Sequence, residues 1–335
     1  MKKRDIVAAI FLLLGTALIT TALVIVFLHY PNRANPIDKT IADFFFSYNN
    51  EALTKIMRII TFLGESIIYV AVLVILYYIW DKSKAYKTIL ILISSVFVVA
   101  TAKVSFHLDR PDEFWGYKQT SETSYGLPSG HTQLSTTFWG ALATIIPKWG
   151  MLSVGVVLPI LIGFSRIFLV VHWFTDVLMG FGIGLIIIGL FIFLEESISN
   201  YIEKQSIKIK FLFVLLLFVV FAIPIIFLHK NNIPNEFEQE INILKVLVLF
   251  TTGSLSYAIE GKIVDYDSKV DRWWKIILRI LIVTIPIAIM YVYDQIITKD
   301  MPLDALKISL DMVVYAIMGP ILFLLFPWII KKLNW

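Results

Sequence analysis

MLSVGVVLPILIGFSRIFLVVHWFTDVLMGFGIGLIIIGLFIFL, residues 151–194, contains two apolar runs with almost no link between them. The runs cover 151–171 and 173–194, and each is close to the roughly 20 residues that a transmembrane helix needs. This stretch therefore predicts two membrane-spanning helices joined by a tight hairpin.

Similar apolar runs occur along the whole chain. Of its 335 residues, 58% are hydrophobic, and the mean hydropathy is +0.81, whereas soluble domains are roughly 45–50% apolar. We therefore expect an all-α polytopic membrane protein, with a six-span core in 1–195 and a four-span C-terminal membrane domain in 209–335. The predicted spans are 6–28, 65–80, 88–105, 130–147, 151–171, 173–194, 209–228, 243–259, 276–293 and 308–330.

The positive charges of the loops predict the orientation of these spans. Ten spans place both termini on one side of the membrane, and the loops on that side carry more Lys and Arg than the opposite loops. The positive-inside rule then predicts that both termini are cytoplasmic. The first run, 6–28, exceeds the roughly 7–15 apolar residues of a cleaved signal, so we expect it to be a retained span.

Composition also argues against several classes of protein. The chain has no cysteine, which excludes disulfides, thiolate metal sites and a Cys nucleophile. Its net charge of +4 is explained by basic cytoplasmic loops, and no folded basic motif for nucleic acid is found. Nothing in the sequence resembles a carboxylate cluster for Mg²⁺ or Zn²⁺. We expect no metal, no cofactor and no nucleic-acid partner.

Three polar motifs lie at predicted outer ends of spans. K-x6-R-P runs from Lys103 to Pro111, P-S-G-H occupies 128–131, and S-R-x5-H-x3-D runs from Ser165 to Asp176. Ionisable residues near membrane spans are costly and are therefore candidates for function. Because the predicted topology brings all three motifs to one membrane depth, we expect them to form a single site that faces the outside.

The residue types in these motifs suit a phosphate group. Lys103, Arg110 and Arg166 supply three positive charges, and guanidinium groups match phosphate oxygens in geometry. Ser129 and Gly130 begin a predicted helix, where backbone N–H groups and the helix dipole favour an anion. These five residues are predicted to bind phosphate, with its charge neutralised by Arg and Lys instead of a metal.

Two histidines supply the predicted catalytic chemistry. His172 and Asp176 are four residues apart and share a helix face, so Asp176 can fix one ring nitrogen and leave the other as a nucleophile. His131 would then protonate the leaving group and later activate water.

Together these motifs resemble the three signature motifs of the type 2 phosphatidic acid phosphatase superfamily. That group includes lipid phosphate phosphatases, bacterial undecaprenyl pyrophosphate and phosphatidylglycerophosphate phosphatases, glucose-6-phosphatase and soluble vanadium haloperoxidases. The resemblance covers roughly residues 60–190. It implies a phosphohistidine on His172, with Asp176 as its partner and His131 as acid and base, and metal-independent hydrolysis of a lipid phosphate or pyrophosphate.

Several alternatives stay open at this point. A lipid phosphotransferase would share the first half-reaction, and a transporter or flippase for phosphorylated lipids would use the additional spans as its pathway. A haloperoxidase is disfavoured by the ten spans, because that branch of the family is soluble. Residues 209–335 are also compatible with a partner-binding or dimerisation module. The sequence leaves the lipid and the oligomeric state undetermined.

Other residues give weaker signals. Asp311 is an acid inside the tenth predicted span without an obvious partner. His107 and Asp109 are interpreted as positional, and His29 and His229 as interfacial. The outer loop also contains aromatic residues that either brace lipid entry or anchor the loop at the interface: Phe114, Trp115 and Tyr117.

Overall fold

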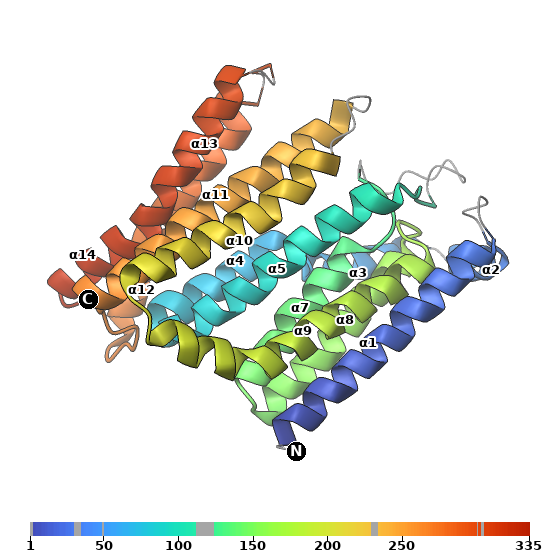
Figure 1. The fold of residues 1–335 in the computed structure, drawn as a ribbon. Helices are drawn as coiled ribbons and strands as arrows, with labels where there is room; N and C mark the ends of the chain where they lie inside the picture. Colours follow the sequence, from blue (N-terminus) through green and yellow to red (C-terminus); the bar gives the residue numbers. More distant parts are fainter. Residues whose placement is uncertain are drawn as a thin grey trace. The chain divides into compact units, whose positions relative to one another are not determined.

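A computed structural model describes residues 3–29, 35–48, 50–111, 124–228, 234–299, 301–302 and 305–335. Within these ranges the regular structure is helical throughout and contains no strand, which confirms the all-α prediction (Figure 1).

The chain forms two compact units, and each unit is assembled from two separate stretches of sequence. Unit 1 comprises Met1–Val70 and Thr88–Ser199, and unit 2 comprises Ala71–Lys87 and Asn200–Trp335. The division into a core, 1–195, and a C-terminal domain, 209–335, remains a prediction. The structural units differ from it chiefly because Ala71–Lys87 packs with the C-terminal part of the chain.

The helices are labelled as in Figure 1. Those that lie mainly in unit 1 are α1 (Lys3–Leu28), α2 (Pro36–Ser47), α3 (Glu51–Phe62), α5 (Lys82–Phe106), α7 (Gly130–Ile145), α8 (Trp149–Phe168) and α9 (Phe174–Glu203), and α4 (Ser66–Ile75) is divided equally between the two units. Those of unit 2 are the π-helical turn η1 (Leu76–Trp80), α10 (Ile207–Leu228), α11 (Pro234–Ile263), α12 (Trp273–Val292), η2 (Tyr293–Ile297), α13 (Ala305–Pro320), η3 (Ile321–Leu325) and α14 (Phe326–Lys332).

All ten predicted spans coincide with helices, but not every one of these helices is long and apolar enough to cross a membrane by itself. Among the described residues, seven helices are long and apolar enough to cross a membrane, and a bent pair, α3 with α4 and η1, makes an eighth candidate. The two halves of this pair, Glu51–Phe62 and Ser66–Trp80, meet at an angle of 45°. The second half corresponds to the predicted span 65–80. Helix α7 has only 16 residues, fewer than the roughly 20 that cross a bilayer unaided. The chain is a multi-pass membrane protein.

Glycines allow α9 to pack closely on two neighbouring helices of unit 1. A Cβ atom on Gly182 would lie 2.8 Å from the carbonyl oxygen of Gly15 in α1, and one on Gly180 would lie 2.8 Å from that of Ser129 at the start of α7. Such separations are possible only without a side chain, as is common where membrane helices meet. The first turns of α7 and α9 are therefore held against each other.

Candidate active site

The link between α8 and α9 is the tight hairpin that the sequence predicts. Val170 has a left-handed φ of 51°, which is rare for a β-branched residue and marks a sharp reversal of the chain. The N–H of Val171 donates to the carbonyl oxygen of Arg166 at 3.2 Å, and that of Leu169 donates to Ser165 at 2.9 Å. The turn thus brings His172 back towards the end of α8.

His172 is held by Asp176 in the geometry expected from their spacing. Nδ1 of His172 lies 3.2 Å from Oδ2 of Asp176, and both side chains are buried. The same oxygen accepts the backbone N–H of Trp173 at 2.9 Å. A carboxylate can only accept here, so Nδ1 carries the proton and Nε2 presents its lone pair.

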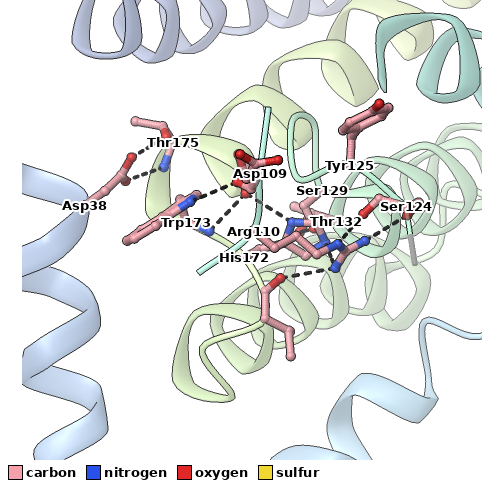
Figure 2. Close-up of polar contacts among 12 residues, drawn as sticks. Asp38, Asp109, Arg110, Ser124, Tyr125, Ser129, Thr132, His172, Trp173 and Thr175 are labelled. Carbon is pink, nitrogen blue, oxygen red and sulfur yellow. Dashed lines mark hydrogen bonds and ion pairs between the residues drawn. The ribbon is translucent and has the colours of Figure 1, made fainter. Parts of the chain in front are cut away.

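Arg110 faces that lone pair (Figure 2). Its Nη1 lies 3.1 Å from His172 Nε2 and donates to the carbonyl oxygen of Val171 at 3.1 Å. Its Nε and Nη2 donate to the carbonyl and hydroxyl oxygens of Ser124, at 2.5 and 2.9 Å. Because the guanidinium can only donate, this contact independently supports the tautomer with the proton on Nδ1.

Lys103 shares the loop anchor of Arg110. Its Nζ donates to Ser124 Oγ at 3.1 Å and to the carbonyl oxygen of Tyr125. Sequence reasoning missed Ser124 and Tyr125, because a short polar residue and a backbone carbonyl in a polar loop leave no spacing signal. Both cations are held by neutral acceptors, so their positive charge is not cancelled by these contacts.

The P-S-G-H motif forms the start of α7, as predicted. Ser129 is buried, its N–H donates to the carbonyl oxygen of Asp176 at 3.0 Å, and its hydroxyl accepts from Thr132 Oγ1 at 3.0 Å. A Cβ atom on Gly130 would lie 3.9 Å from Cε of Lys103. The helix start therefore adjoins both the His172–Asp176 pair and a cation.

His131 and Arg166 both contact the bend between α3 and α4. Nε2 of His131 lies 3.1 Å from Oε1 of Glu65, and Nη1 of Arg166 donates to Thr61 Oγ1 at 3.0 Å. Sequence reasoning missed these two partners, because Thr61 precedes the predicted span 65–80 and Glu65 begins it, and no spacing links either residue to the three motifs. The bend supplies polar side chains to the site in addition to a turn.

Charged residues of all three motifs affect the pKa of His172, which lies in the link between two spans. Burial, followed by the charges of Arg110, Lys103, Arg166 and His131, lowers the pKa of His172 well below its usual value. The imidazole is therefore neutral near neutral pH, which keeps the Nε2 lone pair available.

A buried carboxylate from α2 anchors the start of α9 (Figure 2). Asp38 accepts the backbone N–H of Thr175 at 2.9 Å on Oδ1 and the Thr175 hydroxyl at 2.6 Å on Oδ2. Asn35 donates to the same Oδ2 at 2.6 Å, and Trp173 Nε1 donates to the carbonyl oxygen of Asp109 at 3.1 Å. Sequence reasoning missed Asp38, since no pattern links residues 137 positions apart.

The remaining candidates lie outside this constellation. The ring of His107 packs on Tyr125 at 4.5 Å, and His29 Nδ1 lies 2.9 Å from the carbonyl oxygen of Ile25. Phe114, Trp115, Tyr117 and His229 lie outside the described residues. Within the ranges that the structure covers, no group of three or more His, Asp or Glu side chains is arranged to hold a metal ion.

Part of the chain is similar to known proteins. The family model described as PAP2 superfamily matches residues 84–199. Phosphatidylglycerophosphatase B of Bacillus subtilis is 33% identical over 92 residues, which are 25% of this chain and 45% of that protein. An undecaprenyl-diphosphatase of Sulfolobus acidocaldarius is 37% identical over 62 residues, or 18% of this chain and 30% of the relative. Lipid phosphate phosphatase delta of Arabidopsis thaliana is 27% identical over 118 residues, or 32% and 28%.

The matches cover only part of each protein. The chain spans less than half the length of these curated relatives. The crystal structure of a transmembrane PAP2-type phosphatidylglycerolphosphate phosphatase from Bacillus subtilis aligns over 62% of this chain and 100% of its own, with a TM-score of 0.44 and 24% identity.

Proposed function

We propose that this chain, whose residues 84–199 match the PAP2 superfamily model, is a membrane-embedded lipid phosphatase that forms a phosphohistidine on His172. The observation that carries the proposal is the position of the imidazole. Asp176 holds Nδ1 at 3.2 Å, and Nε2 points at the Arg110 guanidinium 3.1 Å away. A neutral nucleophile next to phosphate-binding cations is what attack on a phosphoryl group requires.

In the first half-reaction, the Nε2 lone pair of His172 forms a bond to phosphorus while the bond from phosphorus to the leaving oxygen breaks. His131 gives a proton to that oxygen. Lys103, Arg110 and Arg166 bind the equatorial phosphoryl oxygens, with the N–H groups at the start of α7. The Asp176 carboxylate stabilises the positive charge that develops on the imidazole.

In the second half-reaction, His131 takes a proton from water, whose oxygen forms a bond to phosphorus. The N–P bond breaks, and its electron pair returns to Nε2 of His172. Inorganic phosphate leaves, and both histidines regain their initial protonation. The protein groups named here supply all proton transfers and charge stabilisation, so the proposal includes no metal ion or cofactor.

The proposed substrate is a lipid phosphate or pyrophosphate at the outer membrane face. The relatives are named for a phosphatidylglycerophosphate, an undecaprenyl diphosphate and a lipid phosphate. The loops on the side of the two termini carry more Lys and Arg than the opposite loops, which supports cytoplasmic termini and an outer position for the ends of α5 and α8. A site at a span end allows acyl or prenyl chains to remain in lipid.

Phosphate release by the purified full chain tests this function. The panel contains phosphatidylglycerophosphate, phosphatidic acid, a sphingoid phosphate and a polyprenyl pyrophosphate. We expect His172→Asn to abolish release and His29→Asn to retain it, because His29 lies apart from the site. Vanadate, which mimics the transferring phosphoryl group, should inhibit, and EDTA should not. Full activity in His172→Asn would reject the mechanism.

The same assay separates hydrolysis from phosphotransfer. A hydrolase releases free phosphate from the lipid donor alone. Release only after a second hydroxyl acceptor is added, with a phosphorylated acceptor as the product, would identify a phosphotransferase.

A further inference from the structure

A second group of ionisable side chains lies inside unit 2, among helices that are candidate membrane spans. Lys245 of α11 forms an ion pair with Asp294 of η2, with Nζ 3.2 Å from Oδ1, and a longer one with Asp311 of α13, at 3.6 Å from Oδ2. Asp311 is 1% exposed and Lys245 is 8% exposed. The acid that the sequence left without an obvious partner thus has one on another helix.

Two tyrosines complete the cluster. Tyr293 Oη donates to Asp311 Oδ1 at 2.8 Å, and Tyr315 Oη donates to Asp294 Oδ2 at 2.5 Å. The Lys245 ammonium also lies 5.4 Å from the centre of the Tyr315 ring. The titratable groups recorded around Asp311 therefore come from three elements: Lys245 from α11, Tyr293 and Asp294 from η2, and Tyr315 from α13.

The formal charges of this cluster do not balance. One ammonium faces two carboxylates, and a phenol donates to each carboxylate without adding charge. An uncompensated charge in a buried membrane site is costly, and such groups adjust their protonation instead. The cluster becomes neutral when it holds one further positive charge.

We propose that this cluster is an exchangeable proton site and that the proton binds Oδ2 of Asp311. That oxygen accepts no hydrogen bond from any described residue, whereas both oxygens of Asp294 have donors, Lys245 and Tyr315. Hydrogen bonds to a carboxylate favour its charged form. The free oxygen of Asp311 therefore binds the proton, and Asp294 keeps its ion pair with Lys245.

A proton fits this site better than a metal cation. A metal ion would need several oxygen ligands and would lie beside the Lys245 ammonium, only 3.6 Å from the available oxygen. A proton needs one oxygen and no additional volume. Asp294, whose side chain is 23% exposed, provides the less buried side of the cluster from which protons exchange.

Another buried carboxylate of unit 2 provides an internal control. Glu260 is 0% exposed, but both its oxygens accept from Lys82 at 3.0 and 3.1 Å, and Oε1 also accepts the N–H of Tyr266 at 2.9 Å. The other acid on Lys82, Asp265, has a side chain that is 76% exposed. The additional negative charge of that cluster therefore lies on exposed Asp265, and both oxygens of Glu260 already have donors.

Dicyclohexylcarbodiimide, which modifies protonated carboxyls in apolar surroundings, is a direct probe of this difference. The full chain in detergent is labelled across a pH series, and the modified peptides are quantified by mass spectrometry. We expect label on Asp311 near neutral pH, because the reagent reacts with a carboxyl group that holds a proton and not with a carboxylate. The label should decrease as pH rises, and Glu260 should remain unlabelled throughout.

Asp294→Asn sharpens this test. The substitution leaves Lys245 with a single carboxylate, so the charges balance and labelling of Asp311 should decrease about tenfold or more near neutral pH. Lys245→Met should have the opposite effect and extend labelling to higher pH. A monodisperse gel-filtration peak confirms that each variant is folded. If a variant does not fold, the wild-type pH series still tests the proposal.

Three results would overturn the proposal. These are absence of label on Asp311 near neutral pH, labelling that ignores both pH and Asp294→Asn, and protection of Asp311 by sodium ions, which would assign the site to a metal cation. None of them bears on phosphate release, which tests the function of unit 1 separately.

Discussion

The two units each contain charged side chains among apolar helices, but the partners recorded for those charges differ. In unit 1, Lys103 and Arg110 are held by neutral oxygens of Ser124 and Tyr125. In unit 2, Lys245 is held between two carboxylates. The first set of contacts satisfies N–H donors with neutral oxygens, whereas the second pairs one ammonium with two carboxylates.

The comparison indicates that the partners of a buried cation affect its chemical role more than its degree of burial does. Arg110 and Lys245 are similarly buried, at 4% and 8% exposure. A carbonyl or hydroxyl satisfies the hydrogen bonds of a cation without cancelling its charge, whereas a carboxylate does both. The chemistry of each unit therefore follows from its acceptors, which belong mostly to residues outside the recognisable motifs.

The largest expected effect removes the nucleophile from the positive site. His172→Asn keeps a side chain that can donate to Asp176 but has no nucleophilic ring nitrogen, so phosphate release should decrease by at least about a thousandfold. His29→Asn is the matched control at another span end. Comparable activity in the two variants would mean that the positive cluster binds phosphate without His172 catalysis.

A smaller loss should follow when the positive charge is kept but its geometry changes. Arg110→Lys retains the charge next to His172 but cannot reach Ser124, Val171 and a phosphoryl oxygen together, so kcat/KM should decrease by about 10- to 100-fold. Arg58→Lys, at an exposed position of α3, should leave kcat/KM unchanged. Equal values for Arg110→Lys and the wild type would show that net charge alone suffices.

The motif residues of the site were predictable from the sequence, because they stand out against apolar spans. Burial and the charges of Arg110, Lys103, Arg166 and His131 all lower the pKa of His172, as the convergence of span ends predicts. The hairpin after α8 was also predictable from the nearly absent link. The catalytic roles of these residues remain predictions that the assays above test.

The supporting contacts were not predictable, for physical reasons. Asp38 and Glu65 contact the site across 137 and 66 residues of sequence, and such pairings depend on helix packing that no local pattern encodes. The same holds for Asp311, whose partner Lys245 lies on another helix. The short α7 and the bent α3–α4 pair also differ from regular spans, since protein neighbours cover polar segments that lipid would not.

The cations near His172 should also control the pH dependence of phosphate release. His172 acts as the neutral imidazole, and its pKa lies well below the usual value, so the acid limb of kcat/KM should lie below about 6.5. Lys103→Met removes one of the charges that lower this pKa. The pKa should then rise, and the acid limb should move to higher pH. If the acid limb of the kcat/KM profile is the same in Lys103→Met and the wild type in the same detergent, the group that limits activity at low pH is not His172.

The smallest effect concerns the backbone of the positive site. Among the described residues, a Cβ atom on Gly130 would meet Val99 and Lys103, at 3.8 and 3.9 Å, which are ordinary contact distances. Gly130→Ala should therefore fold normally, yet its methyl group would occupy space that a phosphoryl group bound at the start of α7 needs. We expect kcat/KM to decrease about tenfold, whereas Gly150→Ala, with nothing described within 4 Å of its Cβ, should be neutral. If both variants keep wild-type kcat/KM, the anion does not approach the first turn of α7, and the positive cluster binds it through side chains alone.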